Sequence, residues 1–115
     1  DVAQLVIYST TGEIPKPVRD AIARAIQLKQ AVQATQQQIA ERTTQKSAIT
    51  EEKNRIPGNM KTVPSTTQYY QRLLEKLNEQ ESTIEKLQSE RDAMLVKRDA
   101  QNAELTEYLN NLTVG

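Results

Sequence analysis

Two long stretches without glycine or proline constrain this chain more than any other feature of its sequence. The first follows Pro17 and runs to Ile56, where Pro57 and Gly58 come next, and the second runs from Ser65 almost to the last residue. Proline suits the first position of a helix and disrupts a helix interior, so we expect Pro17 to open a helix and Pro57 to end it. The sequence therefore predicts two long α-helices.

The two predicted helices form a hairpin. They are expected at residues 17–56 and 65–113, joined by a loop at 57–64, and Ser65 and Gln68 have the spacing of a capping box. Helices of this length need a partner to bury their apolar face. The short connection makes each helix the partner of the other.

The first residues differ in character from the rest. Residues 2–8 are rich in Val, Leu, Ile and Tyr, which is typical of a strand, but a lone strand is not stable. We therefore expect residues 1–15 to be a strand and linker from an upstream β-domain, and 16–115 to be the hairpin. The expected fold class is all-α: a long antiparallel two-helix coiled-coil hairpin with one short N-terminal β-strand.

A heptad repeat runs through both predicted helices, with position a at Val18 in the first and at Tyr70 in the second. If paired residue numbers sum to about 126, every a faces a d, as an antiparallel coiled coil requires. That register places Thr35 opposite Arg91 and pairs the seam residues Val32 with Met94, Ile39 with Leu87, and Ile49 with Leu77. The predicted hairpin seam is thus formed by Val32, Ile39, Ile49, Leu77, Leu87 and Met94.

The two predicted helices carry opposite net charge. Residues 16–56 hold eight basic and four acidic side chains, a net of +4, whereas residues 69–115 hold six basic and nine acidic, a net of −3. Opposite charges attract within one chain, although each exposed pair contributes only ~0.2–1 kcal/mol. Two such pairs are expected beside the seam: Arg24 with Glu104, and Glu52 with Lys76.

The seam is not uniformly apolar. Its half nearer the loop contains more polar residues, and its half nearer the termini has apolar residues outside the a and d positions. A two-helix seam cannot cover the latter, so we expect a second hairpin, the segment 2–8 or an upstream domain to cover them. The expected interface residues are Ile22, Ile26, Leu95, Val96 and Leu109.

Composition argues against several classes of function. The chain has no histidine and no cysteine, so the commonest general base and the usual zinc, haem and iron–sulfur ligands are missing. We therefore predict no catalytic, cofactor-binding or metal-binding residue and no enzyme activity. No stretch approaches the roughly 18–20 apolar residues of a membrane span. Net charge is zero, and the basic residues form no stripe, so no nucleic-acid partner is expected.

The pattern around the turn and along the second helix resembles the C-terminal helical hairpin of a bacterial mucoidy-inhibitor-like family of unknown function. The residues that carry the resemblance are Arg55, Ile56, Asn59, Met60, Tyr70, Leu73, Leu77, Glu79, Gln80, Glu81, Ile84, Glu85, Leu87, Tyr108, Leu109 and Leu112. The resemblance implies an all-β domain followed by this hairpin in a larger bacterial protein. It implies no functional residue.

The function expected from these observations is that of a non-catalytic structural or interaction arm. Such an arm would act by spacing, by self-association or by docking a partner helix, and its partner would be a second copy or the upstream β-domain. One alternative is a nucleic-acid-gripping arm, which would bind in a salt-dependent way. Another is a chaperone-like arm, which would need exposed apolar side chains near the loop. The sequence predicts no cellular compartment.

Overall fold

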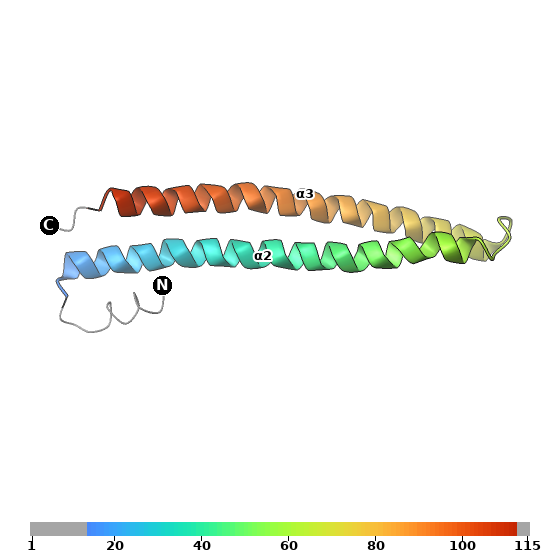
Figure 1. Ribbon diagram of the computed structural model, residues 1–115, viewed down its shortest axis with the longest axis horizontal. Helices are drawn as coiled ribbons and strands as arrows, with labels where there is room; N and C mark the ends of the chain where they lie inside the picture. The colour runs from blue at the N-terminus through green and yellow to red at the C-terminus, as the bar shows by residue number, and fades with distance from the viewer. Residues whose placement is uncertain (1–13, 113–115) are drawn as a thin grey trace. The chain divides into compact units, whose positions relative to one another are not determined.

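A computed structural model describes residues 14–112 of the chain and shows two helices in that part. Helix α2 covers Lys16–Met60 and helix α3 covers Gln68–Asn110. The helices run side by side in opposite directions (Figure 1). The predicted all-α hairpin is therefore confirmed for the described residues. The strand predicted at 2–8 lies outside them.

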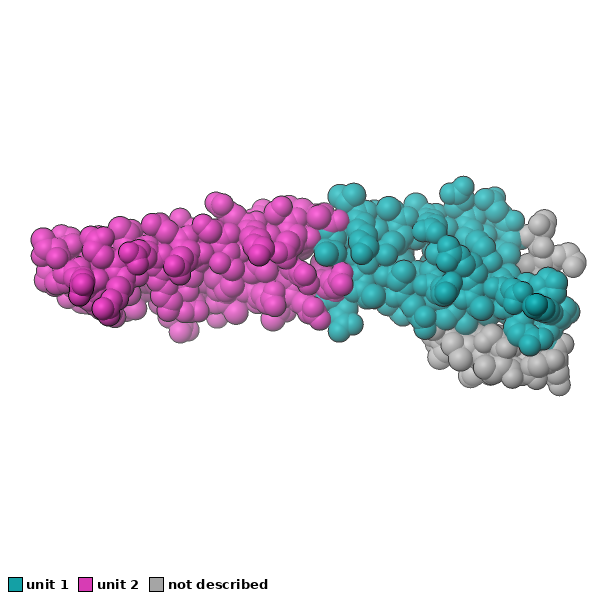
Figure 2. All heavy atoms as spheres, turned by 180° about the vertical axis from the view of Figure 1, so that it is seen from behind, with its two compact units in different colours: residues 1–37, 94–115 teal, residues 38–93 magenta. Residues whose placement is uncertain are grey.

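The chain divides into two compact units, each containing a part of both helices (Figure 2). The terminal unit, as named here, consists of the described residues up to Gln37 and from Met94 onward. The loop unit consists of residues Gln38–Ala93 and includes the connection between the helices. Every contact discussed below lies within one unit.

Helix α2 does not end before Pro57, as the sequence suggested, but continues to Met60. Pro57 is exposed, and its carbonyl still accepts a hydrogen bond from the Lys61 N–H at 3.2 Å. The preceding residue, Ile56, is only 3% exposed, and Met60 one turn later is half-buried. Packing of these two side chains therefore holds the last turn helical. The proline costs one hydrogen bond near the helix end, where few remain to be lost.

The connection is also placed later than predicted, at residues 61–67 instead of 57–64. The residue that caps α3 is Thr67, not Ser65: its Oγ1 accepts a hydrogen bond from the Tyr70 N–H at 3.2 Å. The Thr67 N–H and hydroxyl both donate to the Pro64 carbonyl, at 3.1 and 2.7 Å. This turn after Pro64 occupies the residues that the predicted capping box needed.

The outer helix ends lie close to their predicted positions. Helix α2 begins within one residue of the expected start, and the Arg19 N–H donates to the Pro15 carbonyl at 3.0 Å. Helix α3 ends at Asn110 instead of 113. There the Leu112 N–H donates to the Leu109 carbonyl at 3.3 Å, a bond of the tighter 3₁₀ type that often closes a helix.

Burial follows the heptad repeat in both units. Each a and d residue from Val18 to Ile56, and from Tyr70 to Leu112, is buried or half-buried, whereas most other positions are exposed. Among the predicted seam residues, Val32 and Leu87 are buried, and Ile39, Ile49, Leu77 and Met94 are half-buried. The buried apolar side chains are Ala25, Leu28, Val32, Ile56, Leu73 and Leu87.

The register differs from the predicted one by about one heptad. In the terminal unit the Thr35 hydroxyl donates to Gln101 Oε1 at 2.7 Å. The predicted partner was Arg91, ten residues earlier in the sequence than Gln101. The Tyr108 hydroxyl donates to the Ala21 carbonyl at 3.4 Å. The residue numbers of these contacts sum to 136 and 129, above the predicted 126, so the predicted partner of Thr35 is wrong and the register shifts toward a sum of about 133.

The loop unit shows the same shift. Arg42 Nε lies 3.4 Å from Glu90 Oε2, and Lys53 Nζ lies 3.5 Å from Glu81 Oε1. The physical reason is the extension of α2 past Pro57, which makes the chain turn later. A slip of one heptad keeps every a position opposite a d position, so the apolar pattern alone did not distinguish the two registers.

Candidate protein-binding surface

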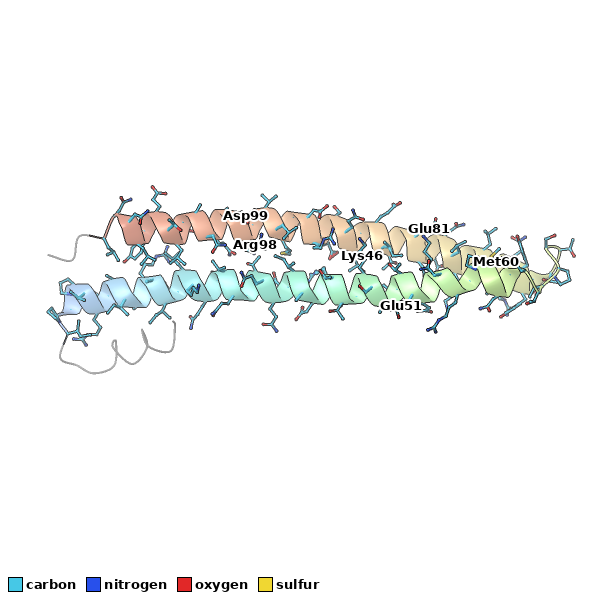
Figure 3. All side chains as sticks on the ribbon, in the orientation of Figure 1. Lys46, Glu51, Met60, Glu81, Arg98 and Asp99 are labelled. Atoms are coloured by element: carbon cyan, nitrogen blue, oxygen red, sulfur yellow. The ribbon has the colours of Figure 1, made fainter. Side chains whose placement is uncertain are left out.

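The seam of the loop unit contains charged residues that reach outward. Lys53 and Arg42 pair with carboxylates of α3, as described above, and both side chains are about 30% exposed or less. Lys46 lies on the side of α2 that faces α3, whereas Glu51 points away (Figure 3). Long basic side chains at such positions lay their carbon stems along the seam and keep the charge in water.

Two buried polar atoms in the loop unit have no hydrogen-bond partner among the described residues. They are Gln80 Oε1 and Arg91 Nε. Arg91 does reach the neighbouring Asp92 through its terminal nitrogen, at 3.3 Å. An unpaired buried donor or acceptor costs ~1–3 kcal/mol, so the seam here is less favourable than its regular heptads suggest.

Ion pairs between g positions lie on one flank of each unit. Arg24 Nη2 lies 3.3 Å from Glu104 Oε1, and Lys76 Nζ lies 2.9 Å from Glu52 Oε1, so both predicted pairs are confirmed. The hydrogen bond from Lys76, and then its positive charge, hold the pKa of Glu52 below the ordinary value of 4.5. All four residues occupy g positions and are solvated. They give this flank a hydrophilic surface.

The opposite flank of the terminal unit carries apolar side chains. We call it the apolar strip, and its members are Ile22, Ile26, Leu95, Val96 and Leu109, the predicted interface residues. Val96 is 71% exposed and Leu109 is 48% exposed. Ile22, Ile26 and Leu95 are half-buried. In the heptad most of them fall at e and b, which lie on the side of the seam away from g. Both helices contribute to this strip.

In the loop unit, the flank formed by e and b positions has a different character. A shallow open groove of about 400 Å³ lies there, lined by Thr43, Lys46, Ser47, Thr50, Glu51 and Arg91. The Thr43 hydroxyl donates to the Ile39 carbonyl at 3.0 Å, and the Thr50 hydroxyl to the Lys46 carbonyl at 2.7 Å. These hydroxyls are thus engaged by their own helix. The groove lacks the enclosure that excludes water around a small-molecule ligand.

The residues near the loop expose apolar surface mainly at Tyr69 and at Leu74, which is 37% exposed. Ile56 is buried, Met60 and Val63 are half-buried, and Tyr69 is 53% exposed. A second open groove of about 270 Å³ lies beside Pro57, Met60, Lys61 and Tyr70. The chaperone-like alternative needs a broader exposed patch at this end than these residues provide.

Two further features of residues 14–112 concern metal ions and membranes. The His, Cys, Asp and Glu side chains of this part form no group of three or more that would hold a metal ion. Neither of the two described helices is long and apolar enough to cross a membrane.

Comparison with known proteins adds no relative. No protein-family model, no curated protein and no solved structure matches the chain. The resemblance to mucoidy-inhibitor-like proteins therefore stays a prediction.

Proposed function

We propose that this chain is a non-catalytic coiled-coil arm of a larger bacterial protein and that it binds protein through the apolar strip. The observation that carries the proposal is the difference between the two flanks of the terminal unit. One flank is closed by the solvated Arg24–Glu104 pair, whereas the other leaves Val96 and Leu109 largely in water.

The strip has the properties of a helix-docking surface. Near the termini, Leu109 of α3 lies beside Ile22 and Ile26 of α2, so an added helix would rest on apolar side chains of both helices there. Removing apolar surface from water is worth about 25 cal/mol per Å² before the costs of association. The seam beneath is already filled by Ala25, Leu28 and Val32, so the strip is not needed to hold the hairpin together.

The distribution of charge supports a protein partner over a nucleic acid. Six basic side chains lie within ion-pair distance of a carboxylate: Arg24, Arg42, Lys53, Lys76, Arg91 and Arg98. Phosphate backbones are bound by unneutralised Lys and Arg gathered on one face. Pairing of these six among the 15 basic side chains lowers the positive charge that a phosphate backbone could use.

A site-specific photo-crosslinker tests the proposal. A photoreactive amino acid replaces Leu109 in the full chain, and a matched variant carries it at Ala100, an exposed α3 residue of the same unit on the other flank. On irradiation in cells that produce the protein, we expect a covalent adduct with a polypeptide from position 109 and little from position 100. Equal yields at the two positions, or none at either, would contradict the proposal.

A further inference from the structure

We infer that the polypeptide on the apolar strip is a second copy of this chain, arranged so that α2 of each copy lies along α3 of the other. The inference rests on the proposed function, because it names the partner of the same surface. It describes an all-antiparallel four-helix bundle of two hairpins, with a two-fold axis parallel to the helices.

The positions of the apolar side chains suit this symmetry. The Tyr108–Ala21 hydrogen bond places the neighbouring Leu109 level with Ile22 and Ile26 along the hairpin. A two-fold axis parallel to the helices leaves the height of each residue along the hairpin unchanged. It places α2 of one copy against α3 of the other. Leu109 of one copy would therefore rest on Ile22 and Ile26 of the other copy, and the reverse contact would form at the same time. One strip thus supplies both halves of an isologous contact.

Charge selects the same arrangement. Helix α2 belongs to a segment with a net charge of +4, and α3 to one with a net charge of −3. Along the strip, Lys29 on α2 and Asp99 on α3 are both exposed and lie within a little over one helical turn of each other in register. Packing α2 against α3 of the other copy brings these opposite charges together twice. A two-fold axis across the helices would instead oppose α2 with α2, and Lys29 with its own copy.

Asp99 has side-chain contact with Arg98 of its own helix, at 3.0 Å, and its side chain is nevertheless 69% exposed. In Figure 3 Arg98 lies toward α2, and Asp99 lies on the outer side of α3. The Asp99 carboxylate can therefore keep its neighbour and still accept a second cation. Asp99 is thus the acidic residue, and Lys29 the basic residue, available beside the strip for an ion pair with the other copy.

The first test compares masses by sedimentation equilibrium. We expect the unmodified chain to dimerise at micromolar concentration, and Ile26→Glu with Leu109→Glu to give a monomer with the helicity kept. Ala34→Glu with Ala100→Glu, on exposed positions of the other flank, should leave the dimer intact. The dissociation constant should rise at least about tenfold for each strip residue replaced, and a rise of the same size in the control pair would overturn the inference.

The second test does not depend on the apolar variants. Lys29→Glu and Asp99→Lys are made in separate chains and then mixed. Each variant alone would place like charges together twice across the dimer, whereas the mixed pair would place opposite charges at both contacts. Native mass spectrometry should show the mixed dimer above its statistical share, and less so at high salt. A statistical mixture would overturn the packing of α2 against α3.

These results separate the inference from the proposed function. A monomeric unmodified chain at micromolar concentration, with an adduct from position 109 to a different protein, would overturn the second copy and leave the protein-binding arm standing. A crosslink from position 109 to residues 1–13 of the same chain would overturn the second copy as well. Absence of any adduct from position 109 would overturn both the second copy and the proposed protein-binding arm.

Discussion

The two units of this hairpin share one heptad repeat and use it differently. In the terminal unit, four successive seam residues of α2 are almost fully enclosed: Ala25, Leu28, Val32 and Thr35 are each 6% exposed or less. In the loop unit, Arg42, Lys46 and Lys53 occupy the corresponding positions and stay half-buried. A position in the heptad fixes the direction of a side chain, and the type of side chain decides how much of it leaves water.

The difference extends to the outer surface. The terminal unit buries its seam well and has apolar side chains left over beside it. The loop unit has a polar seam, two unpaired buried polar atoms and a hydroxyl-lined groove on the same flank. The terminal unit therefore has the more apolar and more deeply buried seam on α2, and it carries the proposed binding surface. The predictions that follow test this comparison.

The largest effect is expected from emptying the terminal seam. Leu28→Ala should lower the free energy of unfolding by ~2–5 kcal/mol, since a leucine that is 6% exposed leaves a cavity when truncated. Ile49→Ala, at a half-buried d position of the loop unit, should cost clearly less because water already reaches that site. Urea unfolding followed by circular dichroism measures both. Equal losses would break the comparison.

The next effect sharpens the register that both units share. A disulfide between Val32→Cys and Gln101→Cys should form within one chain and stabilise the hairpin by ~2–4 kcal/mol, because it constrains the unfolded chain. The pair Val32→Cys and Met94→Cys, which the register predicted from the sequence would join, should remain reduced. Peptide mapping under non-reducing conditions shows which bond forms, and a bond between 32 and 94 would restore the register that sums to about 126.

A smaller effect of opposite sign is expected in the loop unit. Arg91→Leu should be neutral or stabilise the hairpin by about 1–2 kcal/mol, because it removes a buried Nε that has no partner and adds apolar surface to the seam. A matched change, Arg72→Leu on the exposed side of α3, should leave stability nearly unchanged. Thermal unfolding compares them, and a large loss for Arg91→Leu would show that its charge holds the seam.

The smallest effect concerns the charged flank. Lys76 lowers the pKa of Glu52 below 4.5, so the folded chain holds this carboxylate in its charged form more firmly than the unfolded chain does. The contribution is therefore fully present above pH 4.5 and is lost as pH falls through the lower folded pKa. Lys76→Met should lower the free energy of unfolding slightly above pH 4.5 and leave it unchanged in strong acid, where Glu52 is protonated in both variants. If NMR titration gave Glu52 an ordinary pKa, that result would contradict the ion pair between Glu52 and Lys76.

Several features of this protein could be read from its sequence. The stretches between prolines gave the two helices, and the spacing of apolar residues gave the side of each helix that becomes buried. The flanking pairs Arg24–Glu104 and Glu52–Lys76 were also predictable, because each joins a g position of one helix to a g position of the other. The apolar residues of the strip were visible as additions to the heptad. All of these follow from local periodicity, which the order of residues alone specifies.

Other features depended on tertiary packing. The heptad has a period of seven, so its pattern permits registers that differ by seven, and only contacts such as Thr35–Gln101 distinguish them. Burial of Ile56 carries α2 through Pro57 against the local preference of proline. The turn after Pro64 then moves the cap from Ser65 to Thr67. Where local preference and burial compete, burial decides, since the apolar area removed from water outweighs one lost backbone hydrogen bond.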